Sequence, residues 1–136
     1  MELRIFLLAD FANISAGKLN VIGAFNLIWA HQFPAVHPSM YLVAKLAAGY
    51  GEFGVERDFK ILQHDEDGNE LGKIEGRFTF PKPKTGERSE HTIIVGLRDL
   101  KFEKPSRYQF RILVNDILMG DIPLDVVQQN NLPQDT

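Results

Sequence analysis

One segment of the sequence combines aromatic rings with histidines and is the strongest candidate for ligand chemistry. It begins at the only tryptophan of the chain and ends at a proline-flanked histidine, and a tyrosine follows it in a glycine-rich stretch. Flat aromatic rings form stacking platforms for sugars or for the side chains of a protein partner. The candidate ligand-binding residues are Trp29, His31, Phe33, His37 and Tyr50.

The same segment also has a purely structural interpretation, which the residue types favour. Large aromatic side chains are mostly buried in folded proteins. On this interpretation Trp29 ends a core strand, and Phe33 folds in as a plug under the loop that follows. Ligand binding would instead require Trp29, His31 and His37 to converge on an open cavity.

The rest of the sequence offers no constellation of catalytic or metal-binding residues. The chain contains no cysteine, which excludes disulfides, thiolate catalysis and thiolate metal sites. Its four histidines lack the close spacings that zinc sites use. No serine stands in a Gly-x-Ser-x-Gly nucleophile elbow. We therefore predict no catalytic residue, no metal and no cofactor.

Two short stretches imitate binding motifs and are better interpreted as β-turns. Asp65 opens a run that resembles a calcium loop, but Glu70 and Gly76 occupy the positions that require glycine and glutamate. The glycines at 49, 51 and 54 match the phosphate-binding spacing, yet apolar strand-like runs flank them, where the motif needs a following helix. Asp-Gly at 67–68 predicts a hairpin.

Net charge and hydropathy limit the classes of partner that the sequence predicts. The net charge is −3, with 15 basic and 18 acidic residues, and nucleic-acid binding usually needs a clustered basic surface. The apolar run at the amino terminus covers only Ile5–Ala9, whereas a membrane helix needs about 20 residues. We expect no nucleic-acid partner and no membrane association. The absence of cysteine favours a reducing compartment, and we expect the cytoplasm.

Short apolar runs, separated by turns that contain glycine and proline, predict the strands that position the candidate ligand-binding residues. No stretch has the periodicity of a long amphipathic helix, and Gly23 suggests a bulge or a bend within the second run. The pattern predicts an all-β fold, an antiparallel two-sheet sandwich of about eight strands, immunoglobulin-like or a related Greek key. We expect one domain over residues 1–128 and a flexible polar tail at 129–136. The predicted strands are Leu3–Ala9, Leu19–Trp29, Met40–Ala48, Val55–Gln63, Glu70–Phe80, Thr92–Leu97, Tyr108–Val114 and Ile117–Val127.

Three local signals refine this picture. Two prolines in His31–Pro38 predict an ordered crossing loop and not a strand. Asn115 and Asp116 tolerate left-handed backbone and predict a tight turn. Tyr108 follows a bend that contains proline, which resembles the tyrosine corner of Greek-key sandwiches, with ordinary core packing as the alternative.

Several motifs resemble a known family. Leu8–Ala12, Gly17–Phe25 and Phe33–Pro38 resemble small uncharacterised bacterial proteins classed only as a domain of unknown function. Arg107–Phe110 and the turn at Val114–Asp116 are similar to that family too, although its turn usually reads Asp-Gly. The resemblance covers most of the chain and implies no activity and no functional residues.

These observations favour a non-enzymatic binding or assembly module that acts through contacts with a protein partner or by self-association. The alternative is a small-ligand or carbohydrate binder, less favourably a hydrolase, that uses the Trp29–Pro38 loop. Ile117–Ile122 carries few charges and would make a poorly protected strand edge. Since twofold dimers are the commonest oligomers, a homodimer is the expected form of self-association.

Overall fold

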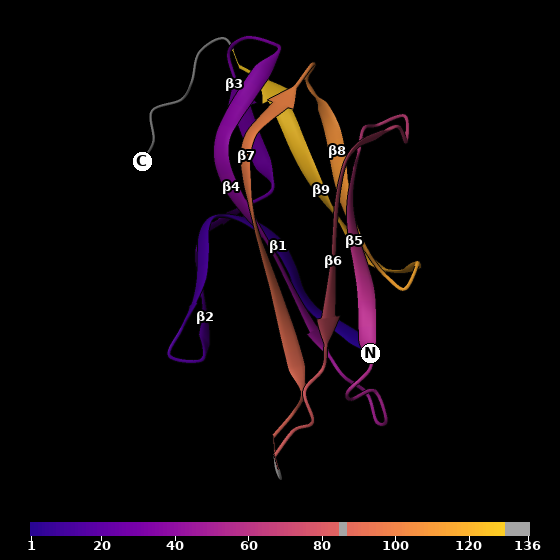
Figure 1. The fold of residues 1–136 in the computed structure, drawn as a ribbon. Helices are drawn as coiled ribbons and strands as arrows, with labels where there is room; N and C mark the ends of the chain where they lie inside the picture. Colours follow the sequence, from indigo (N-terminus) through magenta and orange to yellow (C-terminus); the bar gives the residue numbers. More distant parts are fainter. Residues whose placement is uncertain (85–86, 130–136) are drawn as a thin grey trace.

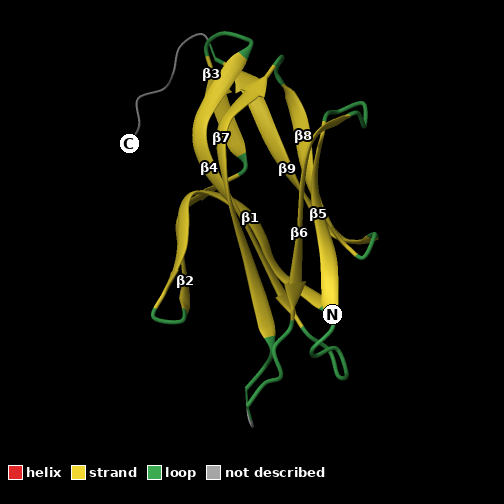
Figure 2. Cartoon of the chain, viewed as in Figure 1, coloured by secondary structure: helices red, strands yellow, loops and turns green. Residues whose placement is uncertain are grey.

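The computed structural model describes residues 1–84 and 87–129, and this part of the chain forms two layers of strands (Figures 1 and 2). One sheet has four strands in the order β2-β1-β4-β7, and the other has five in the order β3-β9-β8-β5-β6. The predicted all-β two-sheet sandwich is confirmed. Most of the predicted tail, residues 130–136, lies outside the described residues. The strands are β1 (Glu2–Ser15), β2 (Lys18–Phe25), β3 (Leu27–Ala30), β4 (Ala35–Ala47), β5 (Glu56–His64), β6 (Glu70–Thr79), β7 (Glu90–Phe102), β8 (Ser106–Val114) and β9 (Ile117–Gln128).

The run predicted as one long strand, Leu19–Trp29, divides between the two sheets. β2 pairs with β1 in the four-stranded sheet, and after Asn26 the chain enters β3, which pairs in parallel with the end of β9. Gly23 has φ +68°, a conformation that glycine adopts without strain. The register between β1 and β2 stays constant across Gly23, so no bulge forms there. The division of the predicted strand between two sheets explains why nine strands form.

The predicted crossing loop at His31–Pro38 is wrong for its second half. Residues 31–34 do cross between the sheets, but β4 already begins at Ala35 and includes Pro38. Proline is tolerated there because β1 pairs with β4 only as far as Tyr41, so Pro38 lies where β4 has a neighbour on the β7 side alone. Opposite Pro38, Asp99 adopts φ +52° and interrupts the regular alternation of β7.

The core lies between the two sheets and follows the period of two that strands impose. In β8 the side chains of Tyr108, Phe110, Ile112 and Val114 are buried and alternate with less buried ones, as predicted. Each fully buried apolar side chain of this size contributes about 1.5–3 kcal/mol to folding. The largest side chains that are less than 2% exposed are Phe80, Phe102, Leu8, Met40, Leu42, Leu46, Ile61, Ile112, Leu124, Val43, Val114 and Val126.

The predicted turns are confirmed. Asp65 Oδ1 accepts hydrogen bonds from the amides of Asp67 (3.0 Å) and Asn69 (2.8 Å), which closes the β5–β6 hairpin. The side-chain amide of Asn69 also donates to this carboxylate, and these bonds lower the pKa of Asp65. Asn115 and Asp116 have φ +48° and +65° at the β8–β9 turn. The carboxylate of Asp65 thus stabilises the turn by accepting hydrogen bonds from backbone amides within it.

Tyr108 forms the tyrosine corner that its position suggested. Its hydroxyl donates a 2.8 Å hydrogen bond to the carbonyl of Lys104, four residues earlier, and the side chain is only 2% exposed. The ring also makes an edge contact with Phe102 at 4.9 Å between centroids. The bend before β8 is therefore fixed to the core by one side chain.

Removing the hydroxyl of Tyr108 should destabilise the fold by a measurable amount. We expect Tyr108→Phe to lower the free energy of unfolding by about 1–2 kcal/mol, because the ring still packs while the Lys104 carbonyl loses its donor. Urea denaturation followed by circular dichroism measures the change. Tyr50→Phe, at a fully exposed tyrosine, is the matched control and should change nothing. Equal stabilities of Tyr108→Phe and wild type would contradict this role for the corner.

His91 introduces a pH-dependent contribution to stability. Its ring lies on β7 and stacks on Phe78 at 4.9 Å and 15° between planes. Burial lowers the pKa of His91 below its ordinary 6.5, because the charged imidazolium is desolvated. The unfolded chain therefore takes up this proton at a higher pH than the folded chain does.

We expect the free energy of unfolding of wild type to fall as the pH drops from 7 to 5. The stability that a neutral His91 provides is complete above the unfolded pKa and is lost below it. His91→Phe keeps the ring stack and should reduce the slope over this range in chemical denaturation series. His31→Gln, at an exposed loop histidine, is the control and should retain the wild-type slope. A slope that survives His91→Phe would assign the pH dependence to another group.

Candidate functional site

A two-stranded arm, residues 9–24, projects from the sandwich and is the most unusual feature of its surface. β4 pairs with β1 only up to the pair of Ala9 and Tyr41, and beyond that point β1 pairs with β2 alone among the described strands. Figures 1 and 2 show this hairpin standing away from the two layers, with its outer side open. Two strands without further support are marginally stable in water, so an arm of this kind gains stability from a covering partner.

The arm exposes apolar side chains on both of its faces. Phe11 and Ile22 are cross-strand partners on one face, 41% and 63% exposed. Ile14 lies on the other face, 53% exposed, opposite Leu19. Residues 9–24 contain only two charged side chains, Asp10 near the base and Lys18 at the tip. The face of Phe11 also carries the polar pairs Asn13–Asn20 and Ser15–Lys18, so its apolar side chains form a patch near the base of the arm. Exposed apolar side chains on both faces make the arm a candidate contact surface.

The sequence fixes the shape of the arm at its tip and at its base. Ala16 and Gly17 have φ +51° and +73°, which closes the hairpin with a two-residue turn of the kind that matches strand twist. At the base, a Cβ on Gly23 would lie 2.4 Å from Oδ2 of Asp10, so the carboxylate occupies the space that a side chain would need. Phe11 makes an edge contact with Tyr41 at 5.5 Å and anchors the arm to β4.

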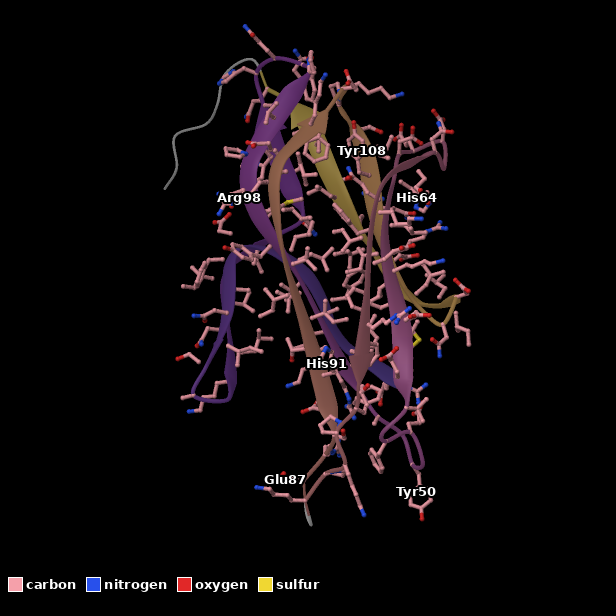
Figure 3. All side chains as sticks on the ribbon, in the orientation of Figure 1. Tyr50, His64, Glu87, His91, Arg98 and Tyr108 are labelled. Carbon is pink, nitrogen blue, oxygen red and sulfur yellow. The ribbon has the colours of Figure 1, made fainter. Side chains whose placement is uncertain are left out.

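The structure does not bring the five predicted ligand-binding residues together. Tyr50 is fully exposed in the β4–β5 loop, at one end of the molecule in Figure 3, whereas β3, which carries Trp29, lies toward the other end in Figure 1. His31 is exposed in the crossing loop, and its carbonyl accepts a bond from Gln128 Nε2 at 3.1 Å. Phe33 packs against the core, as the plug interpretation expects.

Trp29 departs from the structural interpretation, because it is 49% exposed. It lines a shallow hollow of about 350 Å³ together with His37 and Asp10 at the base of the arm. The ring of His37 packs on Phe25 at 5.8 Å between centroids. Two of the five predicted residues, Trp29 and His37, thus share one hollow. Asp10 of β1 also lines it, although the sequence alone does not connect this residue with the site.

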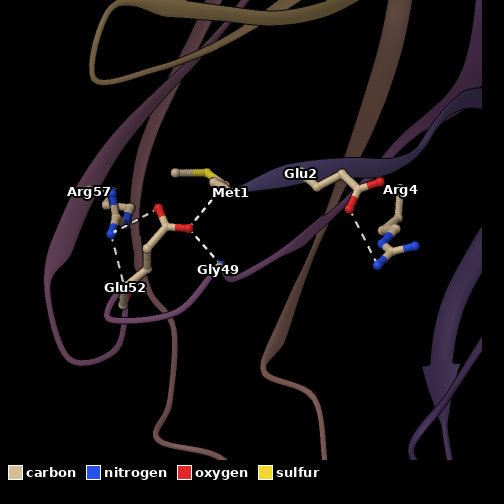
Figure 4. Close-up of polar contacts among 6 residues, drawn as sticks. All are labelled: Met1, Glu2, Arg4, Gly49, Glu52 and Arg57. Carbon is tan, nitrogen blue, oxygen red and sulfur yellow. Dashed lines mark hydrogen bonds and ion pairs between the residues drawn. The ribbon is translucent and has the colours of Figure 1, made fainter.

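A polar cluster around Glu52, drawn in Figure 4, has a structural role. Glu52 accepts hydrogen bonds from the amino group of Met1 and from the amide of Gly49 (2.6 Å), and it pairs with Arg57 at 3.5 Å. The bond from the amino group, opposed by desolvation and assisted by Gly49, lowers the pKa of Glu52. These contacts tie the β4–β5 loop to the start of β1.

Within residues 1–84 and 87–129, no group of three or more metal-ligating side chains gathers closely enough to hold an ion. The described part of the chain also contains no helix long and apolar enough to cross a membrane.

Sequence reasoning missed the arm as a functional element, although a signal was present. From residue 9 to residue 25 the sequence carries just Asp10 and Lys18 as charges and includes a two-residue turn. The sequence pattern predicts only a strand over Leu19–Trp29, because an alternating pattern does not tell whether a second layer covers a strand. Charge depletion on both faces of one hairpin is the observation that would have singled it out.

The fold and the arm define a class: a two-sheet β-sandwich with a projecting, apolar two-stranded arm. The chain belongs to the family of unknown function DUF6941, whose model matches residues 4–127. The matched range includes the whole arm and both sheets. No curated protein matches the chain.

Proposed function

We propose that this protein is a non-enzymatic assembly or binding module that makes its protein contacts through the arm. The observation that carries the proposal is the presence of large exposed apolar side chains on both arm faces, with Phe11 and Ile22 on one and Ile14 on the other. Burying apolar surface of this kind against a partner gains about 25 cal/mol per Å². The proposed setting is the cytoplasm, supported by a chain without cysteine.

Site-specific photo-crosslinking in the source cell tests this proposal. A photoreactive amino acid replaces Ile22 on the arm in one variant and Leu71 on β6 in the matched control; the two side chains are 63% and 50% exposed. Both positions lie on strands at a sheet edge, so they differ mainly in whether the arm is involved. We expect protein adducts from position 22 that are much more abundant than those from position 71.

A second substitution checks that the adducts depend on the apolar surface. Phe11→Lys, at the cross-strand partner of Ile22 on the same face, should reduce crosslinking from position 22 without unfolding the sandwich. Equal adduct yields at positions 22 and 71, or yields unaffected by Phe11→Lys, would refute an arm that acts through protein contacts.

The alternative function is binding of a small ligand or carbohydrate at the hollow lined by Trp29, His37 and Asp10. Its support is the half-exposed indole, which offers a stacking surface beside a carboxylate that can accept hydroxyl donors. Because Trp29 is the only tryptophan, its fluorescence reports directly on occupancy. A saturable fluorescence change with mono- or oligosaccharides, lost in Asp10→Asn, would favour this alternative over the assembly function.

A further inference from the structure

We infer that the partner of the arm is a second copy of this chain, joined by antiparallel pairing of β2 with β2 across a twofold axis. This inference rests on the proposed function of the arm and names its occupant. Joining the two β2 edges would extend the four-stranded sheet into a continuous eight-stranded sheet.

β2 is the least protected of the long open sheet edges among the described strands. The edge strand β6 carries Lys73, Glu75 and Arg77, and the edge strand β7 carries charges at both ends. Charged side chains on an edge discourage pairing with another chain. In contrast, residues 19–25 of β2 contain no charge at all. Alternate residues of a strand bond to each side, so half of the β2 amides and carbonyls face away from β1.

The strand edge that the sequence predicts to be poorly protected, Ile117–Ile122, is less available for pairing than the edge of β2. Ile117–Ile122 belongs to β9, where β3 covers only the end from Asp125 to Gln128. Within the uncovered part of β9, Asp121 adds a charge and Pro123 has no amide hydrogen to donate. Both features disfavour pairing of this edge with another strand.

The charge of β2 itself favours the antiparallel orientation. Lys18 stands at the tip of the hairpin, at the start of β2. Antiparallel pairing places the two lysines at opposite ends of the joined strands. Parallel pairing in register would place them side by side, where like charges repel. Because the contact uses one surface twice, the twofold closes the assembly at two copies.

The length of the edge sets the expected strength. β2 has eight residues, which span about 27 Å at about 3.4 Å per residue. One pair of such strands buries less than the roughly 800 Å² per partner of a standard stable interface. The dimer should therefore form in a concentration-dependent manner, and association must be measured from micromolar to millimolar protein.

Sedimentation equilibrium of the purified full chain is the test. Wild type should rise from 15.4 kDa towards twice that mass with concentration. Ile22→Lys should stay monomeric, because in antiparallel pairing centred on β2 the two lysines lie near the twofold and repel each other. Leu71→Lys, an equally drastic change on the β6 edge, should dimerise like wild type. An equimolar mixture of Ile22→Lys and Ile22→Glu should dimerise, although neither variant does so alone.

The mixture distinguishes a β2–β2 contact from docking of β2 elsewhere on a second copy, since only the former brings positions 22 together. Circular dichroism of each variant confirms the native strand content. A wild-type mass of 15.4 kDa at every concentration, an Ile22→Lys variant that still dimerises, or a mixture without rescue would each overturn the inference. A monomeric wild type that crosslinks other proteins through position 22 would overturn self-pairing and leave the proposed function intact.

Discussion

Phe80→Ala should lower the free energy of unfolding by about 3–5 kcal/mol, the largest effect expected from a single side chain in this protein. Phe80 is completely buried, and its ring makes an edge contact with Phe78 at 5.2 Å. The guanidinium of Arg57 lies over the same ring at 5.8 Å from its centroid. Truncation removes both contacts and leaves a cavity, and the surrounding sheets can relax into it only in part.

Urea denaturation, with circular dichroism and fluorescence as independent probes, measures this loss. Since domains of this size are stable by about 5–15 kcal/mol, the variant should unfold at a much lower urea concentration. Val55→Ala, at a half-exposed position immediately before β5, is the control and should change the free energy of unfolding by less than about 0.5 kcal/mol. A loss below about 1 kcal/mol for Phe80→Ala would show that the two sheets repack around the missing ring.

Gly23→Ala should destabilise the base of the arm by about 2–4 kcal/mol, from two separable causes. A non-glycine residue at φ +68° costs about 1–2 kcal/mol. In addition, the new Cβ would lie 2.4 Å from Oδ2 of Asp10, so the carboxylate or the strand must move. Because the arm contacts the sandwich mainly through β1, the cost should appear as local opening of β2 rather than as global unfolding.

Hydrogen exchange of the amides in β2 is therefore the measurement. Gly17→Ala provides a matched control, because Gly17 has a similar φ of +73° and a Cβ added there would meet no atom within 4 Å, so it carries the conformational cost alone. Asp10→Ala combined with Gly23→Ala should recover the difference between the two glycine variants. If the double variant exchanges as fast as Gly23→Ala alone, the contact with Asp10 does not contribute.

These expectations separate the stability of the sandwich from the behaviour of the arm. Phe80 and Tyr108 fix elements whose neighbours are all within the chain, so their loss weakens the whole fold. Gly23 and Ile22 belong to a hairpin that ends in solvent, so their substitution changes exchange or association with little effect on the core. The two sets of variants therefore test the sandwich and the proposed contact function of the arm independently.

Features that depend on near neighbours along the chain could be predicted from residue types alone. Strands with period two, the Asp65 hairpin, the Asn115–Asp116 turn and the Tyr108 corner all form from residues a few positions apart. Backbone preferences and local hydrogen bonds act over that distance, so residue types are enough to predict them. The family resemblance was visible for the same reason, since it consists of short motifs.

Which strands lie at a sheet edge and which of their faces lack cover became visible only in the folded chain. Pro38 fits inside a strand because β1 has already separated from β4, and no local pattern contains that separation. Trp29 is half exposed and Tyr50 lies far from it, although both are apolar enough for a core. Phe11 and Ile22 are exposed because the sheet has no further layer beside the arm. The alternation of apolar and polar residues shows that a strand has two different faces. Whether a face is buried depends on neighbours that are distant in the sequence.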